Sequence, residues 1–198
     1  MLFSSPPWDS VVYWALDLET GGLDVRQDPI LAVGMVPLRQ GVIRLGESFA
    51  TLVRPPRAEA INPASIRAHQ LVWGEVREAP HVVDVLRTID GRLREGVLLV
   101  HESRIDVAFL KKAYAGCGLR WPAPPVVDTV NLLWKAARMA HFTDPNPPEP
   151  TLNLAAARAE LGLPSYPAHD ALTDAISAAE LFLVLRRKLG ARKLRDLR

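Results

Sequence analysis

Two acidic residues close a short apolar run near the start of the chain. Asp17 and Glu19 end the stretch VVYWALDLE, and Gly21 and Gly22 follow directly. Side chains two apart on a strand share a face, with Cα atoms roughly 6.7 Å apart. Two carboxylates at the end of a buried strand are costly unless a cation binds them, and Mg²⁺ prefers such oxygen ligands. The pair alone also fits two solvated acids at a strand end.

A second acid follows a second apolar run. Asp106 lies in the stretch VHESRIDVAFL (100–110), six residues after the end of VLLV (97–100). The apolar neighbours of Asp106 indicate a helix, and His101 and Glu102 occupy the turn before it. Taken alone, Asp106 also fits a solvent-facing helix residue.

The third stretch is HDALTDA (169–175), which begins an alanine-rich helix. His169 precedes Asp174 by five residues, an offset of about 140° on a continuous helix, so the two would not share a face. They converge only if His169 lies just before the helix, with Asp170 as its N-cap. A structural histidine near a helix start remains the alternative.

Together, the three stretches resemble the motifs of the DEDDh exonuclease family, which includes the proofreading subunit of bacterial replicative DNA polymerase. DLETGGLD (17–24) resembles the first motif, Asp106 the acid of the second, and His169 with Asp174 the H-x4-D third motif. Tyr166 stands eight residues before Asp174, which does not match the tyrosine branch. The resemblance covers about residues 11–185.

Two further segments agree with this resemblance, and one residue departs from it. INPASIRAHQL (61–71) is similar to a family loop between the third strand and the first long helix, and VVDT (126–129) resembles the segment before a later helix. Glu102 stands where family members commonly have asparagine. We expect this extra acid to weaken phosphate approach or to change the substrate preference.

The resemblance implies a two-metal hydrolysis of phosphodiester bonds. Asp17, Glu19, Asp106 and Asp174 would hold two divalent ions, Mg²⁺ or Mn²⁺, and His169 would act as the general base. Histidine suits this task because its ordinary pKa is about 6.5. Like charges in the empty site would raise one or more carboxylate pKa values. The expected products are nucleoside 5′-monophosphates.

The resemblance also points to a substrate and to residues that contact it. We expect removal of nucleotides from the 3′ end of single-stranded DNA, with Thr20, Gly21, Leu23 and His69 in contact with the terminal nucleotides. An exoribonuclease remains an alternative because the sequence does not reveal contacts to a 2′-hydroxyl. A non-catalytic module that binds nucleic acid or a polymerase is a third possibility. A DNA polymerase is a conceivable partner for a role in proofreading or repair.

The periodicity predicts an α/β domain, and the resemblance implies an RNase H-like fold. Three apolar runs (11–18, 31–38 and about 43–54) predict an antiparallel meander, and 97–100 and 126–128 predict two more strands. The order of elements therefore implies a five-stranded mixed sheet flanked by helices. Helices are expected at about 80–94, 104–116, 129–140, 152–162 and 170–189. The proline-rich segment 142–150 is expected to be a loop, either exposed or a partner contact.

Length and composition indicate a single domain over residues 1–198, which the resemblance implies is an exonuclease domain, and we expect it in the cytoplasm. Hydrophobic residues make up 48% and charged residues 23%, which argues against disorder. No membrane-length apolar stretch or signal peptide is evident, and the single Cys117 suits a reducing compartment. The basic tail 186–198 fits either phosphate binding or the solvated, fraying end of the last helix. The five tryptophans are expected to be core or surface anchors rather than stacking platforms.

Overall fold

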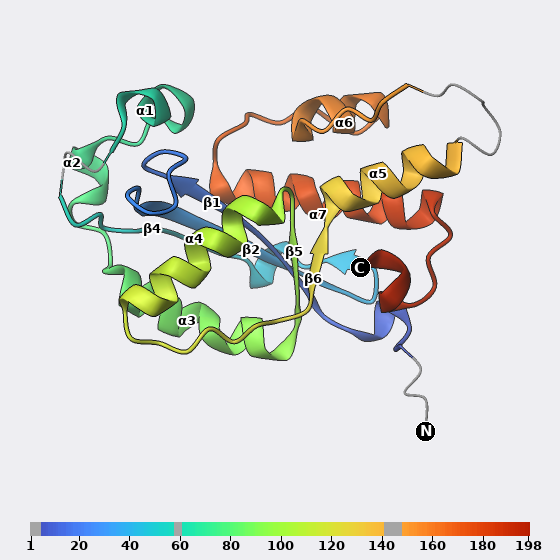
Figure 1. Ribbon diagram of the computed structural model, residues 1–198, viewed down its shortest axis with the longest axis horizontal. Helices are drawn as coiled ribbons and strands as arrows, with labels where there is room; N and C mark the ends of the chain where they lie inside the picture. Colours follow the sequence, from blue (N-terminus) through green and yellow to red (C-terminus); the bar gives the residue numbers. More distant parts are fainter. Residues whose placement is uncertain (1–4, 58–60, 141–147) are drawn as a thin grey trace.

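The fold is built on one mixed sheet, and the computed structural model describes residues 5–57, 61–140 and 148–198. The sheet has the order β3-β2-β1-β5-β6, and β4 also pairs with β2 (Figure 1). β1 runs antiparallel to β2 and parallel to β5, and β5 runs parallel to β6. The strands are β1 (Tyr13–Thr20), β2 (Ile30–Arg39), β3 (Val42–Ile43), β4 (Phe49–Leu52), β5 (Val97–Val100) and β6 (Val126–Asp128).

The expected third strand, 43–54, is interrupted in the structure. A 3-10 turn at Leu45–Glu47 separates β3 from β4. β3 pairs with Leu38 and Arg39 of β2, and β4 pairs with the preceding residues 32–35, so the two pieces lie in line along one edge. Counted as one interrupted edge strand, they give the expected five-stranded mixed sheet, which is confirmed.

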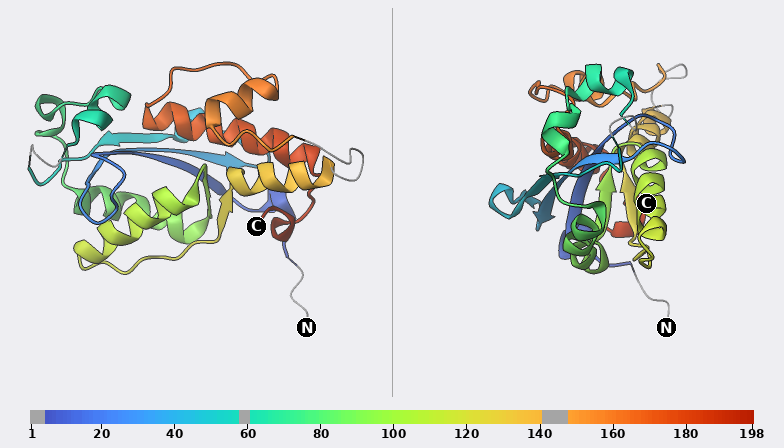
Figure 2. Two further views of the ribbon diagram at one scale, coloured as in Figure 1. Left: turned by 45° about the horizontal axis from the view of Figure 1, so that its top comes forward. Right: turned by 90° about the vertical axis from the view of Figure 1, so that its left-hand side faces the viewer.

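Helices cover both faces of the sheet, as the apolar periodicity predicts (Figure 2). α3 (Val82–Glu95) and α4 (Ser103–Gly116) pack on one face, in a core that includes Leu86, Phe109 and Leu110. The opposite face is covered by α5 (Thr129–Ala140), α6 (Leu154–Glu160) and α7 (Ala171–Lys188). All five helices lie within two residues of their expected bounds. In the described part of the chain, no helix has both the length and the apolarity needed to cross a membrane.

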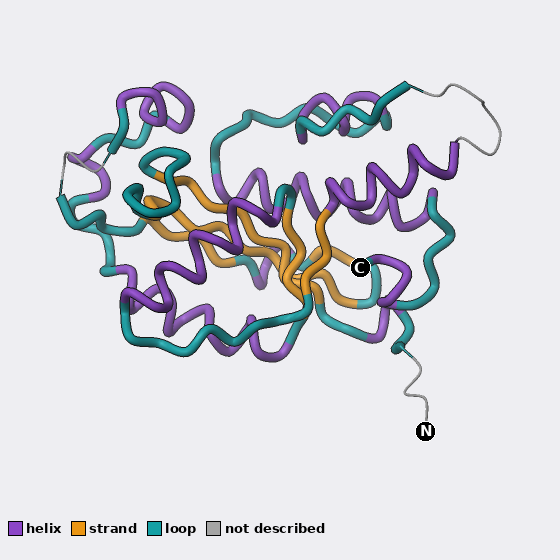
Figure 3. The backbone as a smooth tube through the Cα atoms, in the orientation of Figure 1, coloured by secondary structure: helices purple, strands orange, loops and turns teal. Residues whose placement is uncertain are grey.

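The segment 61–71, expected to be a loop, contains a helix. α1 (Pro63–His69) follows Asn62, whose side chain accepts a hydrogen bond from the backbone N–H of Ala64 at 2.8 Å. The Asn-Pro pair is a helix-start signal, because asparagine caps the first turn and proline fits its first position. Gln70, with φ 61°, ends α1, and the short α2 (Trp73–Val76) follows. Figure 3 shows both helices beyond the end of the sheet.

The basic C-terminal tail is folded, so the expectation of a solvated, fraying end is wrong. Ala191, Leu194 and Leu197 are buried, and a 3-10 helix spans Leu194–Leu197. The backbone N–H of Leu194 donates to the carbonyl of Pro6, next to a 3-10 turn at Trp8–Ser10. Apolar residues between the basic ones therefore hold the tail against the core. Most of the proline-rich segment 142–150 lies outside the described residues.

Candidate active site

The alternation of β1 places Asp17 and Glu19 on one face of the sheet. Tyr13 and Ala15 pack against α5, α6 and α7, whereas the even-numbered residues of β1 pack against α3 and α4. Since side chains alternate along a strand, Asp17 and Glu19 continue the face that α7 covers. Glu19 is only 8% exposed. The two acids therefore extend a buried row of side chains beneath the N-terminal end of α7.

Gly34 allows α7 to come close to the sheet at this point. It lies directly opposite Asp17 in the antiparallel pairing of β1 and β2. A Cβ atom on Gly34 would lie 2.2 Å from the backbone carbonyl carbon of Ala171, the first residue of α7. No side chain larger than hydrogen fits there without a shift of the helix. We did not identify Gly34 from the sequence, although a glycine inside a strand is a signal of close backbone approach.

The start of α7 brings His169 and Asp174 together. Asp170 is the N-cap, and its side chain accepts a hydrogen bond from the N–H of Thr173 at 2.8 Å. His169 lies just before the helix with φ 68°, and its backbone N–H donates to Asp174 Oδ2 at 2.8 Å. His169 therefore lies just before the helix with Asp170 as its N-cap, which confirms the predicted arrangement that brings His169 and Asp174 together. Ligand atoms of Glu19, His169 and Asp174 all lie within 4.8 Å of one another.

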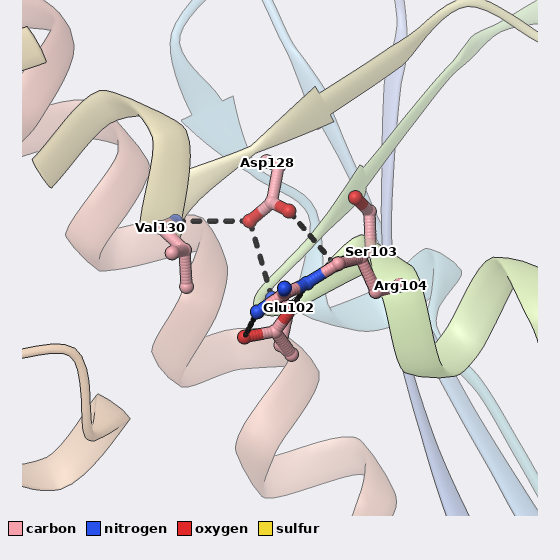
Figure 4. Close-up of polar contacts among 5 residues, drawn as sticks. All are labelled: Glu102, Ser103, Arg104, Asp128 and Val130. Atoms are coloured by element: carbon pink, nitrogen blue, oxygen red, sulfur yellow. Dashed lines mark hydrogen bonds and ion pairs between the residues drawn. The ribbon is translucent and has the colours of Figure 1, made fainter. Parts of the chain in front are cut away.

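Asp106 enters the site from the first turn of α4, which Asp128 holds in place (Figure 4). The Asp128 carboxylate accepts hydrogen bonds from the backbone N–H groups of Glu102 at 3.1 Å, Ser103 at 2.8 Å and Val130 at 2.9 Å. It thereby joins the end of β6 to the start of α4. Asp128 belongs to the VVDT segment, but the sequence did not reveal this supporting role.

Glu102 has an unusual backbone conformation, with φ 76° in the left-handed region. Asparagine tolerates this region better than glutamate, because its short side chain can hydrogen-bond locally. The Glu102 carboxylate pairs with Arg104 at 2.8 Å, and the arginine is largely exposed. Glu102 lines the same cavity as the four acids. Its charge is therefore partly compensated at the rim of the site.

The five expected catalytic side chains line one cavity of about 870 Å³. They come from β1, from the first turn of α4 and from the start of α7, three segments far apart in the sequence. Thr20, Leu23 and His69 also line this cavity. The structure thus brings together the expected catalytic residues, which are Asp17, Glu19, Asp106, His169 and Asp174.

The carboxylates of this cavity hold protons more tightly than ordinary acids. Burial raises the pKa of Asp17 well above its usual value, and the charges of Asp106, Asp174 and Glu19 raise it further. Burial, followed by the charges of Asp174 and Asp170, raises the pKa of Glu19 to about 7. Burial likewise raises the pKa values of Asp106 and Asp174. A cluster of buried acids with raised pKa values favours a cation that neutralises it.

The residues after β1 form a turn that α1 supports. His69 Nδ1 accepts from the N–H of Leu71 at 3.0 Å, so Nε2 carries the proton and donates to the Thr20 carbonyl at 3.2 Å. Gly21 does not line the cavity. Its N–H donates to Pro29, and its carbonyl accepts from Asn62. Its expected contact with substrate stays a prediction.

Leu23 lies at the rim of the cavity and is 81% exposed, the largest exposure among the large exposed hydrophobic residues of the described chain. An apolar side chain in this position is available to contact a base. The expectation that Leu23 and His69 pack against the last bases stays a prediction.

A buried arginine supports the segment that carries His169. Arg158 of α6 is 3% exposed and donates to the carbonyls of Ser177 at 2.7 Å and Pro164 at 2.9 Å. It also pairs with Glu180 at 2.7 Å, and Tyr166 donates to the same carboxylate at 3.1 Å. These bonds fasten the residues before α7 to α6 and α7. An arginine in an alanine-rich helix gave no signal of this role.

His101 fastens another segment that lines the cavity. Its Nε2 lies 2.7 Å from the Leu152 carbonyl, which can only accept, so Nε2 donates. Burial lowers the pKa of His101, and its neutral ring accepts at Nδ1 from the Thr129 hydroxyl at 2.7 Å. His101, which follows β5, thus supports the segment that leads into α6.

The mixed sheet and the clustered acids define a nuclease-like α/β domain, and comparisons with known proteins identify its family. The family model RNase_T, described as Exonuclease, matches residues 14–182. The chain therefore belongs to the DnaQ-like RNase T/exonuclease family, whose enzymes are 3′–5′ exonucleases, as the motifs predicted.

Individual relatives and solved structures agree with this assignment. The chain is 31% identical to a DNA polymerase III subunit epsilon-like protein of Rhodobacter capsulatus, over 95% of this chain and 25% of the relative. It is 28% identical to the DNA polymerase III subunit epsilon of Treponema pallidum, over 89% of this chain and 77% of the relative. The zinc-bound ExoI–ssDNA complex of E. coli matches with a TM-score of 0.78 at 16% identity, over 91% of this chain and 41% of that one. This last likeness supports the RNase H-like fold.

The chain spans about a quarter of the length of the first curated relatives that it matches. The substrates and partners of those longer proteins therefore do not carry over to this chain by similarity alone.

Proposed function

We propose that this chain hydrolyses single-stranded DNA from its 3′ end in a metal-dependent reaction that releases nucleoside 5′-monophosphates. The observation that carries the proposal is the convergence of Asp17, Glu19, Asp106 and Asp174 with His169 in one cavity. A purely structural cluster of acids would be solvated or paired with basic side chains. These acids instead lie largely buried beside one another, which raises their pKa values.

The donor set fits divalent cations. Four carboxylates supply the hard oxygen ligands that Mg²⁺ and Mn²⁺ prefer, and two such ions would balance four negative charges. Asp17, Glu19, Asp106 and Asp174 would hold them, since these four acids share the cavity. When bound, such ions supply a water of lowered pKa and charge stabilisation for the leaving oxygen.

The chain's own residues supply the base and the boundary of the site. His169 is exposed to the cavity beside Glu19 and Asp174, where its ring can accept a proton from an attacking water. The carboxylate of Asp174 accepts the backbone N–H of His169, which fixes the histidine segment relative to the acids. The turn that begins at Thr20, backed by α1, limits the cavity next to Glu19 and gives a place for the end of a nucleic-acid strand.

Single-stranded DNA is the substrate that we favour. The structure of E. coli ExoI, which has the same fold, is a complex with single-stranded DNA. In this chain, the exposed Leu23 offers an apolar contact for an unstacked base. Base contacts of this kind tolerate any sequence. A role in proofreading or repair beside a polymerase belongs to the same proposal, because the Treponema relative is named as a subunit of DNA polymerase III.

The experiment uses a 5′-labelled oligodeoxynucleotide, the same sequence as RNA, and a circular single strand. We expect one-nucleotide shortening of the DNA from its 3′ end with Mg²⁺ or Mn²⁺, none with EDTA, and no cutting of the circle. Asp106→Asn should be at least about 10³-fold slower, whereas the matched change Asp84→Asn, at an exposed acid of α3, should keep full activity.

Three outcomes would contradict the proposal. Faster digestion of RNA than of DNA would assign the chain to RNA processing. Cleavage of the circle would make it an endonuclease. Equal inactivity of the wild type and Asp106→Asn with every substrate would leave only a binding role.

A further inference from the structure

A second groove lies beside the active-site cavity and has a different character. It is lined by Arg54–Pro56, by Trp73, Arg77 and Glu78 around α2, by His81 and Val82 at the start of α3, and by Lys112, Ala113, Gly116 and Cys117 at the end of α4. Its volume is about 780 Å³. In Figure 1 the end of α4 and the start of α3 lie below α2, at the side of the molecule away from α5. We call it the basic groove.

Positive charge exceeds negative charge in the basic groove. Arg54, Arg77 and Lys112 face the single acid Glu78 among its lining residues. Glu78 lies 3.7 Å from Arg54 and 3.4 Å from Arg77, and it is 75% exposed, so these pairs are weak. Lys112 donates to the carbonyl of Asp28 at 2.9 Å and forms no ion pair within the described ranges. The groove thus keeps a net positive charge of two.

The groove also offers an aromatic surface. Trp73 is the first residue of α2, lines the groove and is 37% exposed. A positively charged groove with an accessible aromatic ring is the combination that binds single-stranded nucleic acid without sequence preference. An apolar peptide segment would gain nothing from the surplus of positive charge.

Two segments connect the basic groove with the active-site cavity. Gly22 and Leu23 line the cavity, and the same loop reaches Asp28, whose carbonyl accepts from Lys112 of the groove. A Cβ atom on Gly22 would lie 2.2 Å from the Asp28 carboxylate, so the two ends of this loop are in close contact. The second shared segment runs from Ser65, in the cavity, to Trp73, in the groove. A strand leaving the cavity therefore has a short route to the groove.

The charge of the active site makes such a second contact useful. Four acids lie in the cavity, and two divalent ions would at most balance them. The cavity then has no surplus positive charge with which to hold the polyanionic strand. Lysine and arginine contacts to phosphates supply most of the affinity of non-specific nucleic-acid binding.

We propose that the basic groove binds the part of a single strand that lies on the 5′ side of the terminal nucleotide. Trp73 stacks on a base, contrary to the expectation that the tryptophans are anchors, and Arg77 and Lys112 contact phosphates. This inference rests on the proposed function, since it takes the strand in the groove to be the one whose 3′ end is in the cavity.

The test compares short and long substrates. Hydrolysis of 5′-labelled (dT)₃ and (dT)₁₆ is measured for the wild type, for Trp73→Ala and for Trp134→Ala, a matched control whose tryptophan is 39% exposed on α5. We expect Trp73→Ala to raise KM for (dT)₁₆ about tenfold, within the range of one lost stacking contact. Its kcat on (dT)₁₆ and its rate on (dT)₃ should match the wild type, as should every rate of Trp134→Ala.

A measurement of DNA binding in the absence of metal tests the groove independently of phosphodiester hydrolysis. Anisotropy of labelled (dT)₁₆ in EDTA should show weaker binding for Trp73→Ala and for Arg77→Glu, and the Arg77→Glu variant should depend less on salt. Arg77→Glu keeps the proposal testable if Trp73→Ala does not fold. Poly-glutamate is included as a competitor at equal charge.

The results separate the two proposals. If the wild type hydrolyses neither substrate but binds (dT)₁₆ more tightly than Trp73→Ala does, the proposed function is refuted and the proposal for the groove stands. Equal losses of Trp73→Ala on (dT)₃ and (dT)₁₆, or unchanged binding of both variants, would overturn the groove while hydrolysis stands. Competition by poly-glutamate as strong as that by unlabelled (dT)₁₆ would assign the groove to an acidic peptide and overturn it as well.

Discussion

Replacement of Glu19 by glutamine should stabilise the protein at alkaline pH in the absence of metal. Glu19 is 8% exposed, and its surroundings raise its pKa from 4.5 to about 7. The folded protein therefore binds the proton more tightly than the unfolded chain does. Stability from this group is fully present below about pH 4.5 and is lost as the pH rises through about 7.

The size of the effect follows from the pKa difference. One pKa unit corresponds to 1.36 kcal/mol. Ionisation of Glu19 alone therefore lowers the free energy of unfolding by about 2.5 kcal/mol between pH 5 and pH 8. Glutamine cannot ionise and should not show this loss. At pH 5 the two proteins should have similar free energies of unfolding, and at pH 8 Glu19→Gln should be the more stable by about 2–3 kcal/mol.

The assay is urea unfolding in EDTA at several pH values, with Glu95→Gln as the control. Glu95 is exposed at the end of α3, and its replacement should leave the pH slope of the wild type unchanged. Addition of Mg²⁺ should stabilise the wild type more at pH 8 than at pH 5, because the cation replaces the protons. Parallel curves for the wild type and Glu19→Gln in EDTA would refute the electrostatic reasoning about this site.

Four further substitutions test the parts of the site that position the acids. Gly34→Ala should push α7 away at Ala171, with a loss of about 2–3 kcal/mol in urea unfolding and at least about tenfold in kcat; a fully active variant would contradict the close approach. Asp128→Asn should lose about 1–3 kcal/mol, because an amide offers fewer acceptors to three N–H groups, and kcat should fall with it. Unchanged kcat would mean that Asp128 does not position α4. Arg158→Met should lower the unfolding free energy by about 1–3 kcal/mol, since the carbonyl of the buried Ser177 loses its donor, and a variant as stable as wild type in thermal denaturation would exclude this role. Glu102→Asn should raise the unfolding free energy by about 1 kcal/mol at the left-handed position, and a loss of stability there would contradict the strain.

The sequence predicted the main elements and the catalytic cluster because both depend on local patterns. The alternation of β1 and the apolar spacing of α3 and α7 reflect one buried face each, and such patterns are visible in a single stretch of residues. Asp17, Asp106 and Asp174 were found because each lies next to such an element in a recognisable motif. The family match confirms the resemblance that those motifs suggested, whereas the roles of the individual acids stay predictions.

The parts that the sequence missed depend on contacts between distant segments. Gly34 matters only because α7 arrives opposite it, and Arg158 only because its partners come from the turn before α7 and from α7 itself. The helix at 63–69 is a different case, since Asn62 and Pro63 form a local helix-start signal within the segment that was expected to be a loop. The buried apolar residues of the C-terminal tail were hidden among basic ones.

The central claim is that four carboxylates from three segments hold divalent cations together. The most direct measurement is anomalous diffraction from crystals grown with Mn²⁺ and a nucleoside 5′-monophosphate. We predict manganese peaks bound by Asp17, Glu19, Asp106 and Asp174, with His169 facing them across the cavity. A map without manganese at these acids, or with the carboxylate of Asp106 or Asp174 turned away from the others, would contradict the account.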